Sequence, residues 1–337
     1  MTYALSVLDL APVSSDTTPR AALQASTDLA QAVERLGYHR YWVAEHHGMP
    51  GIASSAPAVL IAHLAAATST LRLGSGGVML PNHAPLVIAE QFGTLEALHP
   101  GRIDLGIGRA PGTDRLTAHA LRRPASVDDF PADLAELRAF LGDGAFPAEH
   151  PYRAVRAVPS GEGRPAIWLL GSSGYSARLA GELGLPFAFA HHFSSQYTIP
   201  AMELYRESFR PSEVLERPYA VVTAAVICAD TSEEAERLAA PAGLSVLRLR
   251  SGHPGLLPTP EEALAHPYTA ADRAAIASFT ASYVVGDPAA VREGLVALQA
   301  RTGADELMLA TNVGEPKARI RSYELVAAEL GLPAMPG

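Results

Sequence analysis

Polar residues and glycines follow short apolar runs at five points of the chain. They are Glu45-His46-His47, Gly76-Gly77, Gly108-Arg109, the segment 171–176 and His191-His192. Histidine suits proton transfer at neutral pH because its reference pKa lies near 6.5. Arginine is a permanent cation with a planar set of donors, which suits a phosphate or a carboxylate. These residue types predict a site that combines proton transfer with anion binding.

The segment 171–176 has the composition of an anion-binding turn. Glycine and hydroxyl residues lead there from an apolar run into a helical pattern: Gly171, Ser172, Ser173, Gly174, Tyr175 and Ser176. Backbone N–H groups at the positive end of a helix dipole bind phosphate, although serine is also a common helix N-cap. Arg109 ends the preceding apolar run, so its guanidinium and this turn could hold one dianion together. A salt bridge from Arg109 to Glu45 or Asp114 is the alternative.

The histidines come in contiguous pairs, His46-His47 and His191-His192, and this spacing disfavours a metal site. Adjacent residues of a strand point to opposite faces, whereas two imidazoles that bind one zinc ion from a strand need the spacing His-x-His. One histidine of each pair is then available for packing or hydrogen bonding. No metal is therefore expected.

Gly76-Gly77 interrupts a run of residues that otherwise has the composition of a strand. Glycine weakens the interior of a strand, so the pair predicts either the close approach of a flat ligand or a strained backbone. A β-bulge explains the two glycines equally well.

Short apolar runs alternate with segments of helical periodicity along the chain. Strands are expected at 3–10, 41–44, 71–80, 103–107, 167–170, 187–190, 220–228 and 306–310, and helices at 18–37, 57–68, 86–98, 130–141, 176–183, 202–209, 233–240 and 317–330. Eight strands alternating with helices predict an α/β fold of the (β/α)8 TIM barrel type. The site residues of such a barrel gather where the carboxyl ends of the strands meet the following loops.

Two irregular segments interrupt this order, one after the fourth strand at about 110–165 and one after the seventh at about 244–287. Neither has enough apolar content for a core of its own, so residues 1–337 are expected to form a single domain. The second segment could close over the barrel as a lid or cover it as a static element. An open doubly wound sheet is the rival architecture, but the glycine-rich segments lack the GxGxxG spacing of a dinucleotide site.

The composition excludes several classes of partner. The formal net charge of −9 gives no broad cationic surface for nucleic acid. Cys228 is the one cysteine, which allows no intrachain disulfide. No apolar run reaches about 18 residues, so neither a membrane span nor an export signal is expected, and we expect a cytoplasmic protein. Alanine and leucine on the helices at 57–68 and 86–98 are compatible with a homodimer.

Four motifs together resemble the bacterial luciferase-like flavin-dependent monooxygenases, in their single-chain branch. The motifs lie at 41–47 (YWVAEHH), 73–81 (LGSGGVMLP), 101–112 (GRIDLGIGRAPG) and 170–176 (LGSSGYS), and the likeness continues at 305–325. The resemblance implies a barrel that binds FMN, with the phosphate held by Arg109 and the serine turn. It also implies a non-prolyl cis peptide at Gly76-Gly77 beside the flavin ring. His46 would lie near the reactive flavin, with His47 as its neighbour.

At two positions this sequence has a glycine where the light-emitting subunit of that family has a different residue. Gly108 stands where that subunit has a reactive cysteine, and Gly171 stands where it has a glutamate near the phosphate. Light emission is therefore not expected, and the phosphate site is expected to be less acidic.

These features lead to the hypothesis of a flavin-dependent monooxygenase. Reduced FMN would react with O2 at ring carbon C4a, and the C4a-peroxyflavin would oxygenate a small organic substrate. His46, with His47 and Glu45, would serve proton transfer. The reduced FMN would come from a separate flavin reductase, since no nicotinamide-binding fingerprint is present. The alternatives are an F420-dependent oxidoreductase and a non-catalytic FMN-binding protein.

Overall fold

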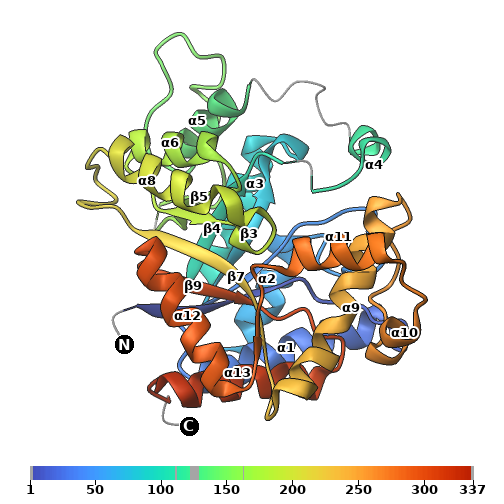
Figure 1. The fold of residues 1–337 in the computed structure, drawn as a ribbon. Helices are drawn as coiled ribbons and strands as arrows, with labels where there is room; N and C mark the ends of the chain where they lie inside the picture. Colours follow the sequence, from blue (N-terminus) through green and yellow to red (C-terminus); the bar gives the residue numbers. More distant parts are fainter. Residues whose placement is uncertain (1–2, 111, 122–128, 162, 335–337) are drawn as a thin grey trace.

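Eight parallel strands close into a barrel in the computed structural model, which describes residues 3–110, 112–121, 129–161 and 163–334 (Figure 1). The strands are β1 (Ala4–Asp9), β2 (Arg40–Val43), β3 (Arg72–Met79), β4 (Ile103–Gly108), β5 (Ala166–Gly171), β6 (Phe187–Phe189), β7 (Ala220–Cys228) and β9 (Glu306–Ala310). The pairings of β6 with β7 and of β1 with β9 complete the ring. The expected (β/α)8 TIM barrel is confirmed, and the open sheet is excluded because its two edges would be unpaired.

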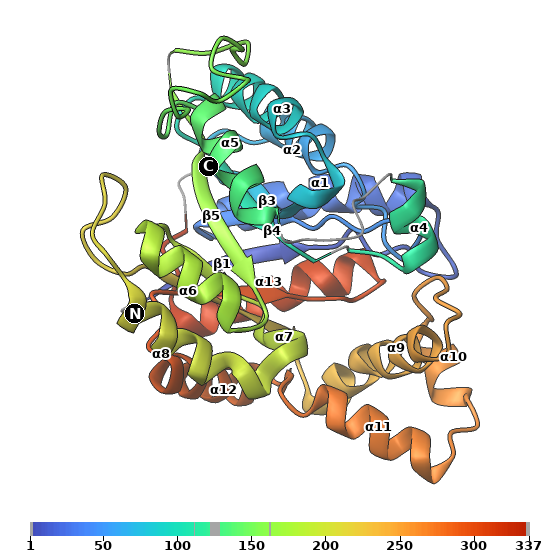
Figure 2. The same cartoon turned by 90° about the horizontal axis from the view of Figure 1, so that it is seen from above.

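Helices cover the outside of this ring (Figure 2). Thr18 begins α1 (Pro19–Arg35), because its side chain accepts from the N–H of Ala21 and Pro19 occupies the first helical position. The other helices around the barrel are α2 (Pro57–Ala67), α3 (Pro85–Leu98), α6 (Gly174–Leu183), α8 (Thr198–Ser208), α12 (Pro288–Thr302) and α13 (Pro316–Leu330), and the short α7 (His191–Ser194) follows β6. Within the described ranges, no helix is both long enough and apolar enough to cross a lipid bilayer.

The second half of the chain differs from the sequence-based expectation in two respects. The sequence predicts a helix that ends at residue 240, but α9 (Ser232–Arg250) continues through Pro241. Proline usually ends a helix because it lacks an N–H. Here Pro241 lies inside the helix and is buried, as are Leu238 and Leu244. The expected elements also lack α12 and the strand β8 (Val284–Gly286), which pairs with β7 outside the ring and is too short to show a period.

The two irregular segments lie outside the barrel wall. The first contains α4 (Arg115–Ala120) and α5 (Phe130–Phe140). The second contains the end of α9, then α10 (Pro260–Ala265), α11 (Ala270–Thr280) and β8, and Figure 2 shows α9, α10 and α11 grouped on one side. Leu257 ties this group to the loop after β1, because its backbone bonds to the backbones of Val13 and Ser15. The second segment is thus anchored to the rim of the barrel.

Inward-pointing side chains fill the barrel in layers, as is usual for this fold. Arg40, Asp104 and Glu306 form the lowest layer, because they stand near the amino-terminal ends of β2, β4 and β9. An apolar cluster packs inside the barrel next to them and contains Leu8, Trp42, Trp168, Ala188, Val221, Met308 and Ala310. Charged and aromatic side chains therefore occupy the lower part of the barrel, and the carboxyl-terminal end is left for a ligand.

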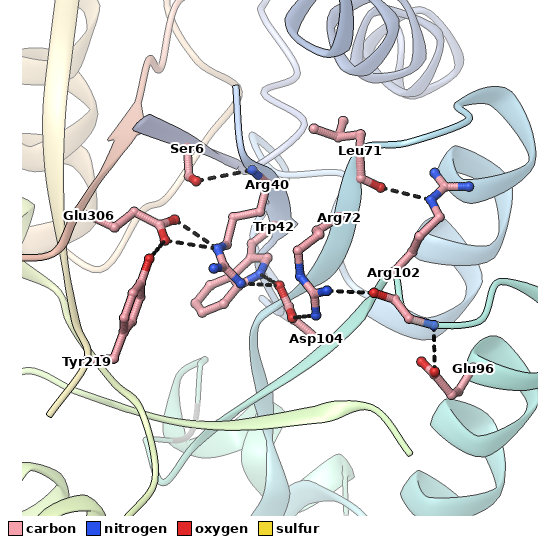
Figure 3. Close-up of polar contacts among 11 residues, drawn as sticks. Ser6, Arg40, Trp42, Leu71, Arg72, Glu96, Arg102, Asp104, Tyr219 and Glu306 are labelled. Atoms are coloured by element: carbon pink, nitrogen blue, oxygen red, sulfur yellow. Dashed lines mark hydrogen bonds and ion pairs between the residues drawn. The ribbon is translucent and has the colours of Figure 1, made fainter. Parts of the chain in front are cut away.

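The lowest layer is a network that we call the floor cluster: Arg40, Arg72, Asp104, Tyr219 and Glu306 (Figure 3). Arg40 donates to Asp104 at 2.6 Å and to Glu306 at 2.8 Å, and Arg72 donates to the other oxygen of Asp104 at 2.6 Å. Burial raises the pKa of Asp104, but Arg40 and Arg72 outweigh it and hold the pKa below its usual value. Because each buried charge has a partner, the cluster is stable only as a complete set.

Removing the Tyr219 hydroxyl is expected to lower the free energy of unfolding by about 1–2 kcal/mol. The hydroxyl donates to Glu306 Oε2 at 3.0 Å, and Glu306 is fully buried. Urea unfolding of Tyr219→Phe measures the change. Tyr152→Phe is the matched control, because the Tyr152 side chain is 46% exposed. Equal stabilities of the two variants would show that Glu306 does not need this donor.

Candidate active site

A cavity of about 260 Å³, which we call the mouth cavity, opens at the carboxyl-terminal ends of the barrel strands. The residues predicted from the sequence that line it are His46, Gly76, Gly77, Arg109, Ser172, Ser173 and Ser176. Gly174 and Tyr175 begin the helix beside it, whereas Glu45 and His47 are not among the described residues of its wall. Most of the predicted groups therefore meet at the end of the barrel where enzymes of this fold have their active sites.

A larger hollow of about 600 Å³ lies on the outer surface, between α3 and the end of α5. It is lined by Arg153, Arg156 and Arg164 and by small residues of α3. The predicted site residues do not line this hollow, and none of the described residues that line it belongs to a barrel strand. The mouth cavity is therefore the candidate active site. The described residues that line the mouth cavity include none from 244–287.

Arg109 and the start of α6 lie together at one end of the mouth cavity. The guanidinium carbon of Arg109 is 4.0 Å from the centre of the Tyr175 ring, a stacking that favours the cation. Ser173 immediately precedes α6, and its side chain makes no capping hydrogen bond to the helix. The first N–H groups of α6 thus lack the acceptor that a serine cap would supply. This end of the cavity offers a permanent cation and a helix N-terminus to the same ligand.

The peptide bond between Gly76 and Gly77 is cis, as the resemblance implies. The register of β3 against β4 shifts between Ser75 and Val78. Gly76 and Gly77 therefore also lie at an irregularity of the strand, which is what the β-bulge alternative predicts. A side chain would not fit here, because a Cβ on Gly77 would lie 2.7 Å from the carbonyl oxygen of Gly106. The two glycines therefore present bare backbone to the cavity.

His46 lies in the cavity wall just after β2. Its Nδ1 is 3.2 Å from the carbonyl oxygen of Gly112. Because a carbonyl oxygen can only accept, Nδ1 carries the hydrogen and Nε2 keeps its lone pair. Burial lowers the pKa of His46 below its usual value, and the bond to Gly112 and the charge of Glu45 offset this only in part. At neutral pH His46 is therefore an uncharged imidazole, and its Nε2 makes no hydrogen bond to the residues that the structure describes.

Glu45 and His47 belong to a separate hydrogen-bond cluster. The Glu45 carboxylate is fully buried and accepts from His47 at 3.0 Å, His83 at 2.9 Å, Asn82 at 3.1 Å and the N–H of Met79 at 3.0 Å. Burial raises the pKa of Glu45, but His83 and the other donors hold it below its usual value. This cluster joins the loop after β2 to the segment after β3. It therefore fixes the loop that carries His46.

The second histidine pair divides between the core and the mouth cavity. His191 is 3% exposed, and its Nδ1 lies 2.7 Å from Thr198 Oγ1. His192 lines the cavity, and its Nδ1 lies 3.4 Å from the carbonyl oxygen of Thr223. Burial lowers the pKa of each to about 4, so both are uncharged at neutral pH. His192 is thus the member of the pair that lines the mouth cavity.

The family model described as luciferase-like monooxygenase matches residues 3–306 of this chain. The chain belongs to this family. A luciferase-like monooxygenase of Escherichia coli (strain K12) is 49% identical over 96% of this chain and 96% of its own length. The uncharacterized protein YvbT of Bacillus subtilis (strain 168) is 52% identical over 96% of this chain and 95% of its own length. The resemblance that the motifs carry is confirmed.

Solved structures share the barrel of this luciferase-like monooxygenase. Apo-MsnO8 matches with a TM-score of 0.90 and 41% identity over 99% of this chain and all of its own. The oxygenating constituent of 3,6-diketocamphane monooxygenase from Pseudomonas putida, in complex with FMN, matches with a TM-score of 0.73 and 20% identity over the full length of both chains. An F420-dependent secondary alcohol dehydrogenase matches with a TM-score of 0.70 and 16% identity over 98% of this chain and 99% of its own. The last two likenesses show the fold alone.

Membership of the luciferase-like monooxygenases supports an oxidoreductase of the monooxygenase class. N-acetyl-S-alkylcysteine monooxygenase of Bacillus subtilis (strain 168) is 36% identical over 96% of this chain and 97% of its own length. A monooxygenase transfers one oxygen atom of O2 to its substrate, so O2 and a small molecule are the reactants that the family implies.

Acidification from pH 6.5 to pH 4 is expected to destabilise this luciferase-like monooxygenase. The pKa of His191 and of His192 is about 4 in the folded protein, against about 6.5 in an unfolded chain. Between these values the unfolded chain binds more protons, so the free energy of unfolding falls as the pH falls. Urea unfolding at several pH values measures the slope, which His191→Asn should reduce. A slope that His191→Asn leaves unchanged would contradict the low pKa of His191.

Proposed function

We propose that this luciferase-like monooxygenase binds FMN in the mouth cavity and uses reduced FMN and O2 to oxygenate a small organic substrate. The composition of the cavity carries the proposal. It combines the bare Gly76-Gly77 backbone, the end formed by Arg109 and α6, and the uncharged His46. These three features suit, in turn, a flat ring, a phosphate and a proton transfer.

The phosphate of FMN fits the end of the cavity at α6. Arg109, Ser172, Ser173 and Ser176 line this end, and an anion can take the place of the missing side-chain cap by accepting from the N–H groups of Gly174 and Tyr175. Gly171 permits the turn, because a Cβ there would lie 2.8 Å from the Cβ of Ser176. The planar guanidinium of Arg109 would bind the phosphate through charge-assisted hydrogen bonds.

The flavin ring fits beside the glycine backbone. Gly76, Gly77 and Gly108 line the cavity without side chains, and Leu8, Trp42 and Met308 give it an apolar base. Bound in reduced form, FMN would supply the electrons that activate O2 at its C4a carbon. The chain itself would hold the ring in this slot and exclude water from the reacting atoms.

His46 is the residue that we assign to proton transfer. It lines the cavity and is uncharged at neutral pH. Its Nε2 would accept a proton while Nδ1 keeps its hydrogen bond to the carbonyl oxygen of Gly112. Glu45 and His47 have a different place in this proposal, because their hydrogen bonds run to His83 and to each other. They position His46 and do not touch the reactants.

The proposal extends to the partners and to the domain organisation. Reduced FMN would come from a separate flavin reductase, since the sequence has no GxGxxG fingerprint for a nicotinamide. The segments 110–165 and 244–287 would belong to one domain with the barrel, in keeping with the backbone bonds of Leu257 to the rim. A homodimer would cover Val59, Val87 and Leu98, which are exposed apolar side chains of α2 and α3.

Cofactor titration and isotope transfer test the proposal. We expect the protein to quench the fluorescence of FMN at lower concentration than that of F420. With reduced FMN it should transfer oxygen from labelled O2 to the thioether sulfur of N-acetyl-S-methylcysteine or of its amide, test substrates chosen from the relative named for N-acetyl-S-alkylcysteine. Tight binding of F420 without binding of FMN would show that F420, and not FMN, is the cofactor. FMN binding without any O2 uptake would instead support the non-catalytic FMN-binding protein.

A further inference from the structure

Two imidazoles line the mouth cavity from opposite sides of the barrel. His46 follows β2 and His192 follows β6. In the ring these strands are separated by β3, β4 and β5 on one side and by β1, β9 and β7 on the other. The proposed proton transfer uses His46 and leaves His192 without a role. A cavity-facing histidine that the reaction does not use is a candidate for binding the substrate.

The carbonyl oxygen of Thr223 fixes the hydrogen of His192. It lies 3.4 Å from Nδ1, and because a carbonyl can only accept, Nδ1 carries the hydrogen. Nε2 of His192 then has a lone pair and no hydrogen. The low pKa of His192, about 4, keeps the ring in this uncharged form at neutral pH.

The wall around His192 has no cation to hold a carboxylate. Ala190, Phe193 and Thr223 line the cavity beside it. Arg109 is the one permanently charged side chain among the described residues of the cavity wall, and it lies at the α6 end. A substrate carboxylate beside His192 would face a lone pair, whereas an N–H or O–H group would find an acceptor.

We propose that Nε2 of His192 accepts a hydrogen bond from an amide or hydroxyl group of the substrate, so that the enzyme prefers uncharged, donor-bearing substrates to carboxylates. The inference rests on the proposed function, because it assigns the Arg109 end of the cavity to FMN. His192 is then a specificity-determining residue, distinct from His46 in position and in task.

The test uses the FMN complex of the full chain and two probes, N-acetyl-S-methylcysteinamide and the corresponding acid, N-acetyl-S-methylcysteine. The flavin absorbance change on titration gives a dissociation constant for each probe. We expect the amide to bind about 10-fold or more tightly than the acid, because a site built for a donor leaves a carboxylate unpaired. Nitrogen-15 NMR of the histidine side chains should show His192 with the hydrogen on Nδ1, and its Nε2 signal should shift when the amide binds.

Two variants separate recognition from structure. His192→Asn keeps a donor near Thr223 but has no atom at the position of Nε2, so the amide should bind about 10- to 100-fold more weakly. The longer side chain in His192→Gln carries an amide oxygen closer to the position of Nε2, so this variant should recover much of the affinity for the amide. His191→Asn is the matched control, because His191 is buried against Thr198 and does not line the cavity. Both probes should bind that control as they bind the unaltered protein.

The outcomes distinguish this inference from the proposed function. An acid that binds as tightly as the amide, an amide that does not bind, or amide affinity unchanged in His192→Asn overturns the inference. So does a hydrogen on Nε2 of His192, or a loss of FMN affinity in His192→Asn, which would place His192 on the cofactor. Failure of the unaltered protein to bind FMN would instead reject the proposed function itself.

Discussion

Arg109→Ala is expected to bind FMN about 10- to 100-fold more weakly than the unaltered protein. The guanidinium lines the mouth cavity beside the uncapped start of α6, where the phosphate would lie. A charge-assisted hydrogen bond contributes about 1.5–3 kcal/mol, which corresponds to this loss of affinity. Fluorescence titration with FMN measures it. Riboflavin, which has the same ring without the phosphate, should lose little affinity in the variant.

Two further variants show whether the effect is specific to the Arg109 side chain. Arg178→Ala makes the same change in charge on an exposed part of α6 that does not line the cavity, and it should bind FMN normally. Arg109→Lys keeps a positive charge but lacks the planar guanidinium. Its FMN affinity should lie between that of Arg109→Ala and that of the unaltered protein. Thermal unfolding of each variant shows that the fold survives the loss of stacking on Tyr175. Unchanged FMN affinity in Arg109→Ala would remove this residue from the phosphate site.

Replacing His46 is expected to lower the turnover number about 10²- to 10⁴-fold, the range in which general acid–base groups contribute. FMN affinity should change little, because the phosphate end of the cavity lies on β4 and β5 and His46 follows β2. Oxygen transfer and FMN titration, measured side by side on His46→Ala, separate the two effects. His46→Asn is the finer variant, since its amide can still donate to Gly112 while Nε2 is lost.

The pH profile gives a second readout for His46. The pKa of His46 is lowered, so the base form persists below pH 6.5, and activity should decline as the pH falls through that lowered pKa. This acid limb should disappear in both His46 variants. His63→Ala is the control, because His63 is an exposed residue of α2 that bonds to Thr27. Oxygenation by His46→Ala at the unaltered rate would reject the assignment.

The barrel could be predicted from the sequence because its strands are short, apolar and regularly spaced between helical segments. The end of the mouth cavity formed by Arg109 and the serine turn could also be predicted, because parallel strands that are neighbours in the ring bring their carboxyl ends together. The structure places β4 beside β5, as this reasoning requires. Periodicity and strand direction thus determine which loops meet at the mouth cavity.

Other features depend on contacts that periodicity does not encode. β2 ends at Val43, so Glu45, His46 and His47 lie in a loop where strand alternation no longer determines direction. Asn82 and His83 both bind Glu45 in the structure, and nothing in the residue pattern predicts these two contacts. In the floor cluster, Arg40 and Glu306 are 266 positions apart in the chain, and their pairing follows from barrel closure.

The floor cluster also determines how molecules reach the cavity. Arg40, Asp104 and Glu306 plug the lower end of the barrel, and Trp42 and Trp168 lie directly above them. Among the described residues, the lower end of the barrel is therefore filled, and the mouth cavity opens at the carboxyl-terminal ends of the strands. With FMN seated as proposed, on the glycine backbone at the base of the cavity, the substrate would lie above it. The flavin would then enter before the substrate and leave after the product.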